Sequence, residues 1–273
     1  MTESTFRLPK DIPLEEYPQP EVFLDEARRL IGEAQKQGFV LRVMGPIALH
    51  FYFPQHVDLY RRMERLGERV FTDIDFAAYG KYKSALPKFF QAQGYAYDPQ
   101  LLMLFGQNRH VYFAGRVPMV DIFYDGLWMN HWVDYRNRLE FDPLCVSLTD
   151  LLLQKLQIVQ INDKDLKDCM LLLLAAPVGE ADVGTINTRY VAGLFSWDWG
   201  FYHTATTNLR RVQEAMERVV VLGPEQRAVI AAKVQQLLQA IEAEPKKLKW
   251  KLRAKVGTRQ RWYNEVSDWG DSV

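Results

Sequence analysis

The chain has few of the features that mark secreted or membrane proteins. It carries only two cysteines, Cys145 and Cys169, without metal-type spacing, and this predicts buried thiols in a reducing compartment. Its longest apolar run, residues 170–178, is far shorter than the roughly 20 residues that span a bilayer. The polar residues 1–5 lack the apolar stretch of a signal peptide. We therefore expect a cytoplasmic protein with no membrane partner.

The sequence also lacks an excess of charge of either sign. The 34 Lys and Arg residues balance 34 Asp and Glu residues, so any nucleic-acid contact has to come from a local patch. No His-Glu-x-x-His, Gly-x-Ser-x-Gly or P-loop pattern is present, and the five histidines have no ligand spacing. Hydrolase and P-loop functions are therefore without support.

What the sequence does contain is a pair of acids inside an apolar segment. Asp73 and Asp75 lie one residue apart between Phe71 and Phe76. On a strand they share one face, with backbones roughly 6–7 Å apart. Such a pair suits one or two divalent cations, which in two-metal sites lie about 3.5–4 Å from each other. On its own, however, an Asp-x-Asp pair is also typical of a turn or a solvated strand face.

The first half of the chain mixes helix and strand patterns. Residues 1–20 hold four prolines and are expected to form an extended arm before an α/β domain over residues 21–145. The patterns predict helix 21–37, strand 39–44, a helix opening at Gly45, a partly helical stretch 54–69, strand 71–76, helix 84–93, and strands 101–105, 110–113 and 117–124. Pro46 suits the helix start, because proline lacks an N–H that would be unpaired there anyway.

The second half reads as helical. Ser147–Asp150 has the form of a capping box ahead of a helix over residues 151–161. Further helices are expected at 163–175, 209–222 and 224–244, with residues 197–200 at a turn. We therefore expect an α+β protein with a mixed sheet and flanking helices, followed by a helical domain over residues 146–244 and a basic tail over residues 245–273.

Three features follow one another in an order that predicts a reaction. A helix begins at Gly45, a strand carries Asp73 and Asp75, and a later strand carries Asp121 between apolar neighbours. A helix N-terminus offers unpaired N–H groups and a positive dipole end to phosphate. Strand carboxylates offer hard oxygen ligands to Mg²⁺. Together these parts suit a nucleoside triphosphate and its metal ions.

This order resembles the nucleotidyltransferase superfamily, which has the polymerase-beta-like fold. The residues that carry the resemblance are Gly45, Thr72-Asp73-Ile74-Asp75 and Val120-Asp121-Ile122-Phe123. The downstream segments 151–156 and 164–168 look like the helical part of abortive-infection-type toxins and related bacterial nucleotidyltransferases. The resemblance covers about residues 39–175.

The resemblance implies a magnesium-dependent transfer of a nucleoside monophosphate from an NTP to an acceptor hydroxyl, with release of pyrophosphate. The acceptor is an RNA end, a small molecule or a protein side chain. By the same resemblance Asp73, Asp75 and Asp121 bind Mg²⁺ or Mn²⁺ and are catalytic, with Asp121 also activating or orienting the acceptor. The residues that it assigns to the nucleotide and its phosphates are Gly45, Thr72, Lys155 and Lys164.

Some residues depart from the family pattern or have simpler explanations. Pro46 stands where the family has glycine or serine, which removes a donor and a hydroxyl, and the interval from Gly45 to Asp73 is long. These departures keep open a catalytically weakened nucleotide-binding member. Asp121 suits an exposed edge strand as well. Lys155 alternatively reaches solvent from an apolar helix, and Lys164 and Asp168 suit an ordinary i,i+4 ion pair.

The tail has a local excess of positive charge. Eight basic residues and no acid lie between Glu244 and Glu265, with Trp250 and Trp262 among them. Basic charge with stacking aromatics suits RNA or single-stranded DNA, and favours a toxin-system component acting on tRNA as an alternative function. A solvated helix whose tryptophans pack on the core explains the same pattern. Arg69, just before the acid pair, suits either phosphate or a solvated face.

Overall fold

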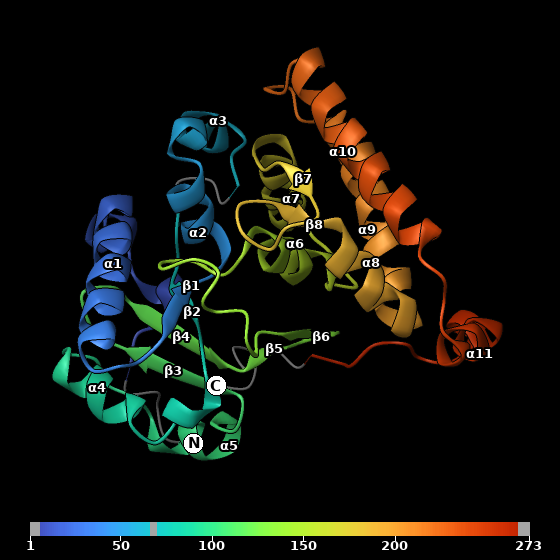
Figure 1. Ribbon diagram of the computed structural model, residues 1–273. Coiled ribbons are helices and arrows are strands. Elements are labelled where there is room, and N and C mark those ends of the chain that lie inside the picture. The colour runs from blue at the N-terminus through green and yellow to red at the C-terminus, as the bar shows by residue number, and fades with distance from the viewer. Residues whose placement is uncertain (1–5, 66–69, 267–273) are drawn as a thin grey trace.

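We describe a computed structural model of the chain, which covers residues 6–65 and 70–266 (Figure 1). The helices are α1 (Pro20–Lys36), α2 (Gly45–Tyr52), α3 (Val57–Arg62), α4 (Leu86–Ala92), α5 (Pro99–Phe105), α6 (Leu148–Leu156), α7 (Asp163–Ala175), α8 (Thr188–Trp197), α9 (Trp199–Met216), α10 (Pro224–Ala243) and α11 (Leu248–Val256). The strands are β1 (Leu41–Val43), β2 (Ile74–Ala78), β3 (Arg109–Phe113), β4 (Met119–Tyr124), β5 (Gly126–Trp128), β6 (Trp132–Asp134), β7 (Val178–Gly179) and β8 (Ile186–Asn187).

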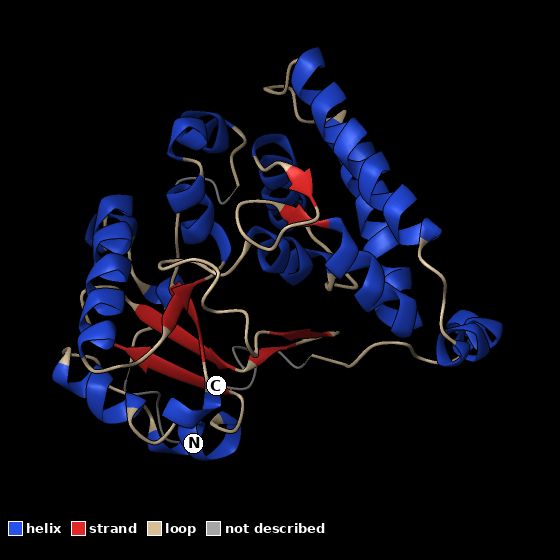
Figure 2. Ribbon diagram, in the orientation of Figure 1, coloured by secondary structure: helices blue, strands red, loops and turns tan. Residues whose placement is uncertain are grey.

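A four-stranded mixed sheet of order β1-β2-β4-β3 forms the centre of the first half (Figure 2). β2 and β4 run parallel, whereas β1 and β3 pair antiparallel with their neighbours. In the register of β2 and β4, Asp75 lies directly opposite Asp121. Ile74 and Phe76, which flank Asp75, and Val120 and Ile122, which flank Asp121, are fully buried, because they point to the face of the sheet opposite the acids. The sheet therefore holds these two acids in fixed positions.

One continuous core joins the sheet to the helical half. Phe76 and Ile122 on the strands, Phe23 on α1, and Leu152 on α6 are all completely buried in the same apolar cluster. Fully burying such a side chain contributes about 1.5–3 kcal/mol. This shared core thus fixes α6 and α7 relative to the strands that carry the acids.

The end of the described chain returns to the first half. After α11, which packs on α8 and α9, an extended segment runs back to the turn between β5 and β6 (Figure 1). There the Asn264 N–H donates to the Asn130 carbonyl at 2.9 Å, and Asn130 Nδ2 donates to the Asn264 carbonyl at 2.9 Å. The segment passes close to Gly200 on α9. A larger residue would clash there, since a Cβ would lie 2.4 Å from the Trp262 carbonyl oxygen.

The α+β prediction is confirmed, with a mixed sheet and flanking helices ahead of a helical region. The strand expected at residues 101–105 is wrong: this segment is helix α5, because the Asp98 carboxylate caps the N–H groups of Gln100 and Leu101 and Pro99 opens the first turn. The helix expected over 151–161 ends at Leu156. There Asn208 Nδ2 donates to the carbonyls of Leu156 and Ile158 and so replaces the helical bonds.

Both cysteines are buried thiols, as the sequence predicts. In the described ranges we find no helix that combines the length and the apolar character needed to cross a membrane. Helix α8, strands β5 to β8 and the return of residues 262–266 were not expected from the sequence patterns.

His131, beside the turn that holds Asn264, makes the stability of the protein depend on pH. The ring is 5 % exposed, lies parallel to Phe201 at 5.0 Å, and its Nε2 is 2.8 Å from Thr204 Oγ1. Burial lowers its pKa to about 4. Between pH 6.5 and 4 the unfolded chain therefore binds a proton at this residue that the folded protein does not.

We expect the free energy of unfolding to fall as the pH drops through this window, with about 3 kcal/mol due to His131 alone. Urea unfolding at several pH values between 7 and 4 measures this loss. His131→Gln removes the titrating group, so its stability is expected to fall less steeply with acid, whatever its value at pH 7. Equal slopes for both proteins would refute the assignment.

Candidate active site

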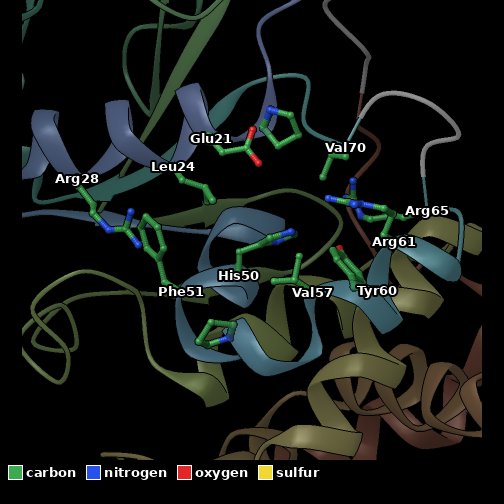
Figure 3. Close-up of a pocket in the computed structure, with 12 residues that line it drawn as sticks. Glu21, Leu24, Arg28, His50, Phe51, Val57, Tyr60, Arg61, Arg65 and Val70 are labelled. Carbon is green, nitrogen blue, oxygen red and sulfur yellow. The ribbon is translucent and has the colours of Figure 1, made fainter.

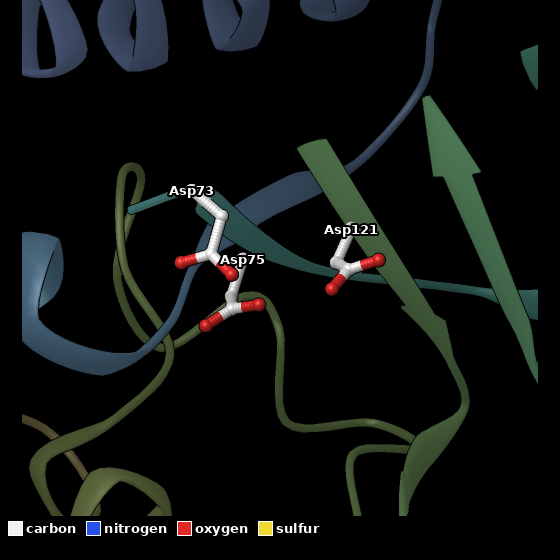
Figure 4. Close-up of side chains that lie close together, drawn as sticks. All are labelled: Asp73, Asp75 and Asp121. Carbon is white, nitrogen blue, oxygen red and sulfur yellow. The ribbon is translucent and has the colours of Figure 1, made fainter. Parts of the chain in front are cut away.

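Three carboxylates meet at one end of the parallel strand pair. Asp73, Asp75 and Asp121 each place a carboxylate oxygen within 4.8 Å of the others (Figure 4). Asp75 and Asp121 are register partners, and Asp73 lies two residues earlier, just before β2, so that it shares their face. The structure therefore brings together the three acids that the sequence singles out.

The acids repel one another in a setting that disfavours charge. Burial, and then the Asp121 carboxylate, raises the pKa of Asp73. Burial, followed by repulsion from Asp73 and Asp121, raises the pKa of Asp75 well above its usual value. A divalent cation relieves this repulsion, and a set of three carboxylates is the donor chemistry that Mg²⁺ and Mn²⁺ prefer. The residues present thus fit the metal ions that the sequence predicts.

Arg109 on β3 holds the third acid and was missed by the sequence analysis. Its Nη2 lies 2.5 Å from Asp121 Oδ2, and its Nε donates to Oδ1 at 3.2 Å. Burial opposes the charge of Arg109, but the Asp121 carboxylate outweighs it and raises the pKa of Arg109. Asp121 is 2 % exposed, so it is not the solvated edge residue of the simpler interpretation. Extending the expected strand 110–113 by one residue places Arg109 on the acid face.

The N-terminus of α2 lies against the same acids. Met44 N–H donates to the Asp75 carbonyl at 2.9 Å, which ties the start of the helix to β2. Gly45 has φ +60°, and a Cβ there would lie 3.4 Å from Asp75 Oδ2. Its N–H donates to Gln154 Oε1 at 3.4 Å. The positive φ therefore requires glycine here, and a Cβ would lie in van der Waals contact with the acid.

Gly45→Ala is expected to lower the free energy of unfolding by about 1–2 kcal/mol, because alanine disfavours a left-handed backbone. It is also expected to weaken Mn²⁺ binding, measured by titration calorimetry, because the new methyl group would take space beside Asp75 Oδ2, an oxygen that would bind the ion. Gly38→Ala is the matched control: Gly38 has φ +77° but nothing within 4 Å of a Cβ. It is expected to lose similar stability and to bind Mn²⁺ normally. Weakened Mn²⁺ binding in both variants would contradict the role given to the contact between a Cβ at position 45 and Asp75 Oδ2.

The two predicted phosphate residues nearest the acids differ in their contacts. Thr72 Oγ1 donates to Asp73 Oδ1 at 3.0 Å, so its hydroxyl proton is already used to orient one of the acids. Lys164 is exposed, and its charge acts to lower the pKa of Asp73 against the larger effect of burial. In the described ranges its ammonium has no ion pair, which leaves it available to an anion.

Lys155 belongs to a buried charge network. Its Nζ lies 2.7 Å from Asp165 Oδ1 and 2.8 Å from Asp168 Oδ2, while Arg65 Nε lies 2.6 Å from Asp168 Oδ1. Tyr60 also donates its hydroxyl to Asp168. Lys155 therefore does not simply extend into solvent, and Asp168 is not the surface partner of Lys164. A phosphate contact by Lys155 stays a prediction.

All seven predicted site residues line one cleft. It has a volume of about 900 Å³, at the upper end of the range for ligand pockets. Arg65, Arg109 and Gln154 line it as well, and none of them was predicted. Its remaining wall includes Tyr263, Glu265 and Val266 from the returning tail. Arg69 lies outside the described residues.

The tail presents lysines to solvent and packs its tryptophans. Lys249, Lys251 and Lys255 are exposed. By contrast, the Trp250 ring lies 5.1 Å from Tyr202, and Trp262 Nε1 donates to Thr204 Oγ1 at 3.0 Å. This geometry agrees with the solvated-helix explanation, and RNA binding by the tail stays a prediction that rests on the lysines.

No family model and no curated protein matches the chain. Among solved structures, the chain is similar to that of the antibiotic-resistance factor ANT(2'')-Ia, with 14 % identity over 81 % of this chain and 95 % of that one. The TM-score is 0.34, so this likeness carries no argument about the function.

Proposed function

We propose that the protein is a magnesium-dependent nucleotidyltransferase that moves a nucleoside monophosphate from an NTP to an acceptor hydroxyl. The observation that carries this proposal is the meeting of Asp73, Asp75 and Asp121 within 4.8 Å, beside the N-terminus of α2, in a cleft of about 900 Å³. Such a site combines acids for metal ions with the positive dipole end of a helix and cations for phosphate.

In the proposed reaction the acceptor oxygen attacks the α-phosphorus, the bond to the bridging oxygen of pyrophosphate breaks, and the hydroxyl proton passes to a carboxylate. Bound Mg²⁺ would supply charge neutralisation for the triphosphate. We assign this proton to Asp121, which Arg109 orients through two hydrogen bonds. Lys164 and the N-terminus of α2 stabilise negative charge on the leaving pyrophosphate.

The test is pyrophosphate release from each of the four NTPs with Mg²⁺ or Mn²⁺, with total RNA or a mixed metabolite extract as acceptor. We expect release with at least one combination and none when EDTA is present. A folded protein that neither binds any NTP nor releases pyrophosphate would overturn the nucleotide site itself.

A second candidate is a catalytically weakened protein that binds a nucleotide without transferring it. Two observations favour it: Pro46 offers no N–H at the start of α2, and Arg109 occupies both oxygens of Asp121. Metal-dependent NTP binding without pyrophosphate release, for any acceptor, would select this candidate. Turnover would exclude it.

A further inference from the structure

A second pocket lies between α1, α2 and α3, away from the three acids (Figure 3). Its volume is about 170 Å³. An engineered apolar cavity of about 150 Å³ is large enough for benzene, so this pocket holds one ring or one branched chain. Apart from Arg65, none of the residues that line it also lines the cleft.

Much of the lining of this pocket is apolar. It is contributed by Leu24 on α1, Phe51 on α2 and Val57 at the start of α3, with Pro54 and Val70. His50 lies at the centre, where Nδ1 donates to the Pro46 carbonyl at 3.0 Å (Figure 3). Because burial lowers the pKa of His50, the ring is neutral at pH 7 and brings no charge.

Arginines lie at both ends of the pocket: Arg28 is beside Phe51 at one end, and Arg61 and Arg65 are at the other (Figure 3). Among the described residues that line the pocket, one is an acid, Glu21. Arg65 uses Nε and Nη2 on Asp168, and Arg28 lies over the Phe51 ring at 4.5 Å. The side chain of Arg61 is exposed and has no ion pair or hydrogen bond within the described residues. A ligand can therefore pair with its guanidinium without breaking an ion pair or hydrogen bond to another described residue.

We propose that this pocket binds a small organic carboxylate, whose apolar body lies between Leu24 and Val57 and whose carboxylate meets the guanidinium of Arg61. The apolar part of the lining favours an organic acid over an inorganic anion, because phosphate or sulfate would leave that surface unfilled. The arginines favour an acid over a neutral molecule of the same shape. The site is independent of the transfer reaction proposed above.

The experiment uses the full chain and benzoate as the probe, with benzamide as its neutral counterpart and inorganic phosphate as an anion without an apolar body. Titrations followed by calorimetry or protein NMR are expected to show benzoate binding at millimolar concentration, with benzamide and phosphate much weaker. Arg61→Ala is expected to weaken benzoate binding about tenfold, the value of one charge-assisted hydrogen bond. Val57→Phe fills the space beside Leu24 and is expected to remove binding.

Two matched variants separate this pocket from other cationic surfaces. Arg62→Ala removes the neighbouring charge on α3, which pairs with Asp58, and Lys164→Ala removes a cation of the cleft. Both are expected to bind benzoate as the wild type does. The proposal fails if benzoate does not bind, if benzamide or phosphate binds equally well, or if Arg61→Ala leaves the affinity unchanged. It also fails if Lys164→Ala has the larger effect, since the probe would then occupy the cleft.

Discussion

Asp75→Asn is expected to lower the rate of pyrophosphate release about 10³-fold or more. Asparagine keeps the size of the side chain but removes the charge from the residue that lies opposite Asp121 in the sheet. A factor of 10³ corresponds to about 4 kcal/mol, which is within the several kcal/mol that metal ions supply in such sites. The rate is measured by a coupled pyrophosphate assay with saturating NTP.

Asp58→Asn serves as the control for this change, because Asp58 is an exposed acid on α3 whose contact is a surface ion pair with Arg62. It is expected to leave the rate unaltered. Mn²⁺ titration provides the second readout: Asp75→Asn is expected to bind the ion much more weakly. Retention of both turnover and Mn²⁺ affinity would remove Asp75 from the metal site.

Asp168→Asn is expected to give the largest loss of stability, about 3–5 kcal/mol in the free energy of unfolding. Asp168 is 1 % exposed and accepts from Lys155, Arg65 and Tyr60, which come from α6, from the segment after α3, and from α3 itself. Burial works against its charge, yet the lysine and arginine beside it lower its pKa. The amide would leave these two cations buried without a full counter-charge.

Urea unfolding at pH 7 measures this effect, with Glu180→Gln as the comparison. Glu180 pairs with Arg189 at 2.5 Å, but both side chains are largely exposed. Losing a surface pair costs about 1 kcal/mol or less. If the two variants lost similar amounts, the network around Asp168 would not be a main support of α3 against α7.

The positions of the three acids were predictable because a strand alternates its faces and because Asp121 interrupts an apolar run. Their distance from one another was not, since it depends on β2 and β4 being parallel neighbours with Asp75 opposite Asp121. The apolar run before Phe105 shows the limit of such patterns. A short apolar run fits a strand or a helix equally, and the Asp98 cap decided the outcome.

The contacts that the sequence did not indicate join residues far apart in the chain. Tyr60 and Asp168 are 108 residues apart, and Asn130 and Asn264 are 134 apart. The local periodicity of apolar residues does not indicate contacts between residues so far apart. For the same reason the role of the tail was predicted only from its charge, whereas the structure places residues 263, 265 and 266 in the wall of the cleft.

The return of residues 262–266 also has a consequence for synthesis of the protein. A ribosome makes the chain from the N-terminus at about 5–20 residues per second, and domains fold as they emerge. The three acids and α2 are complete long before Tyr263 and Glu265 are added. A nascent chain that has not reached residue 263 therefore has its acids but only part of the surface around them, so the cleft is completed well after its acids are made.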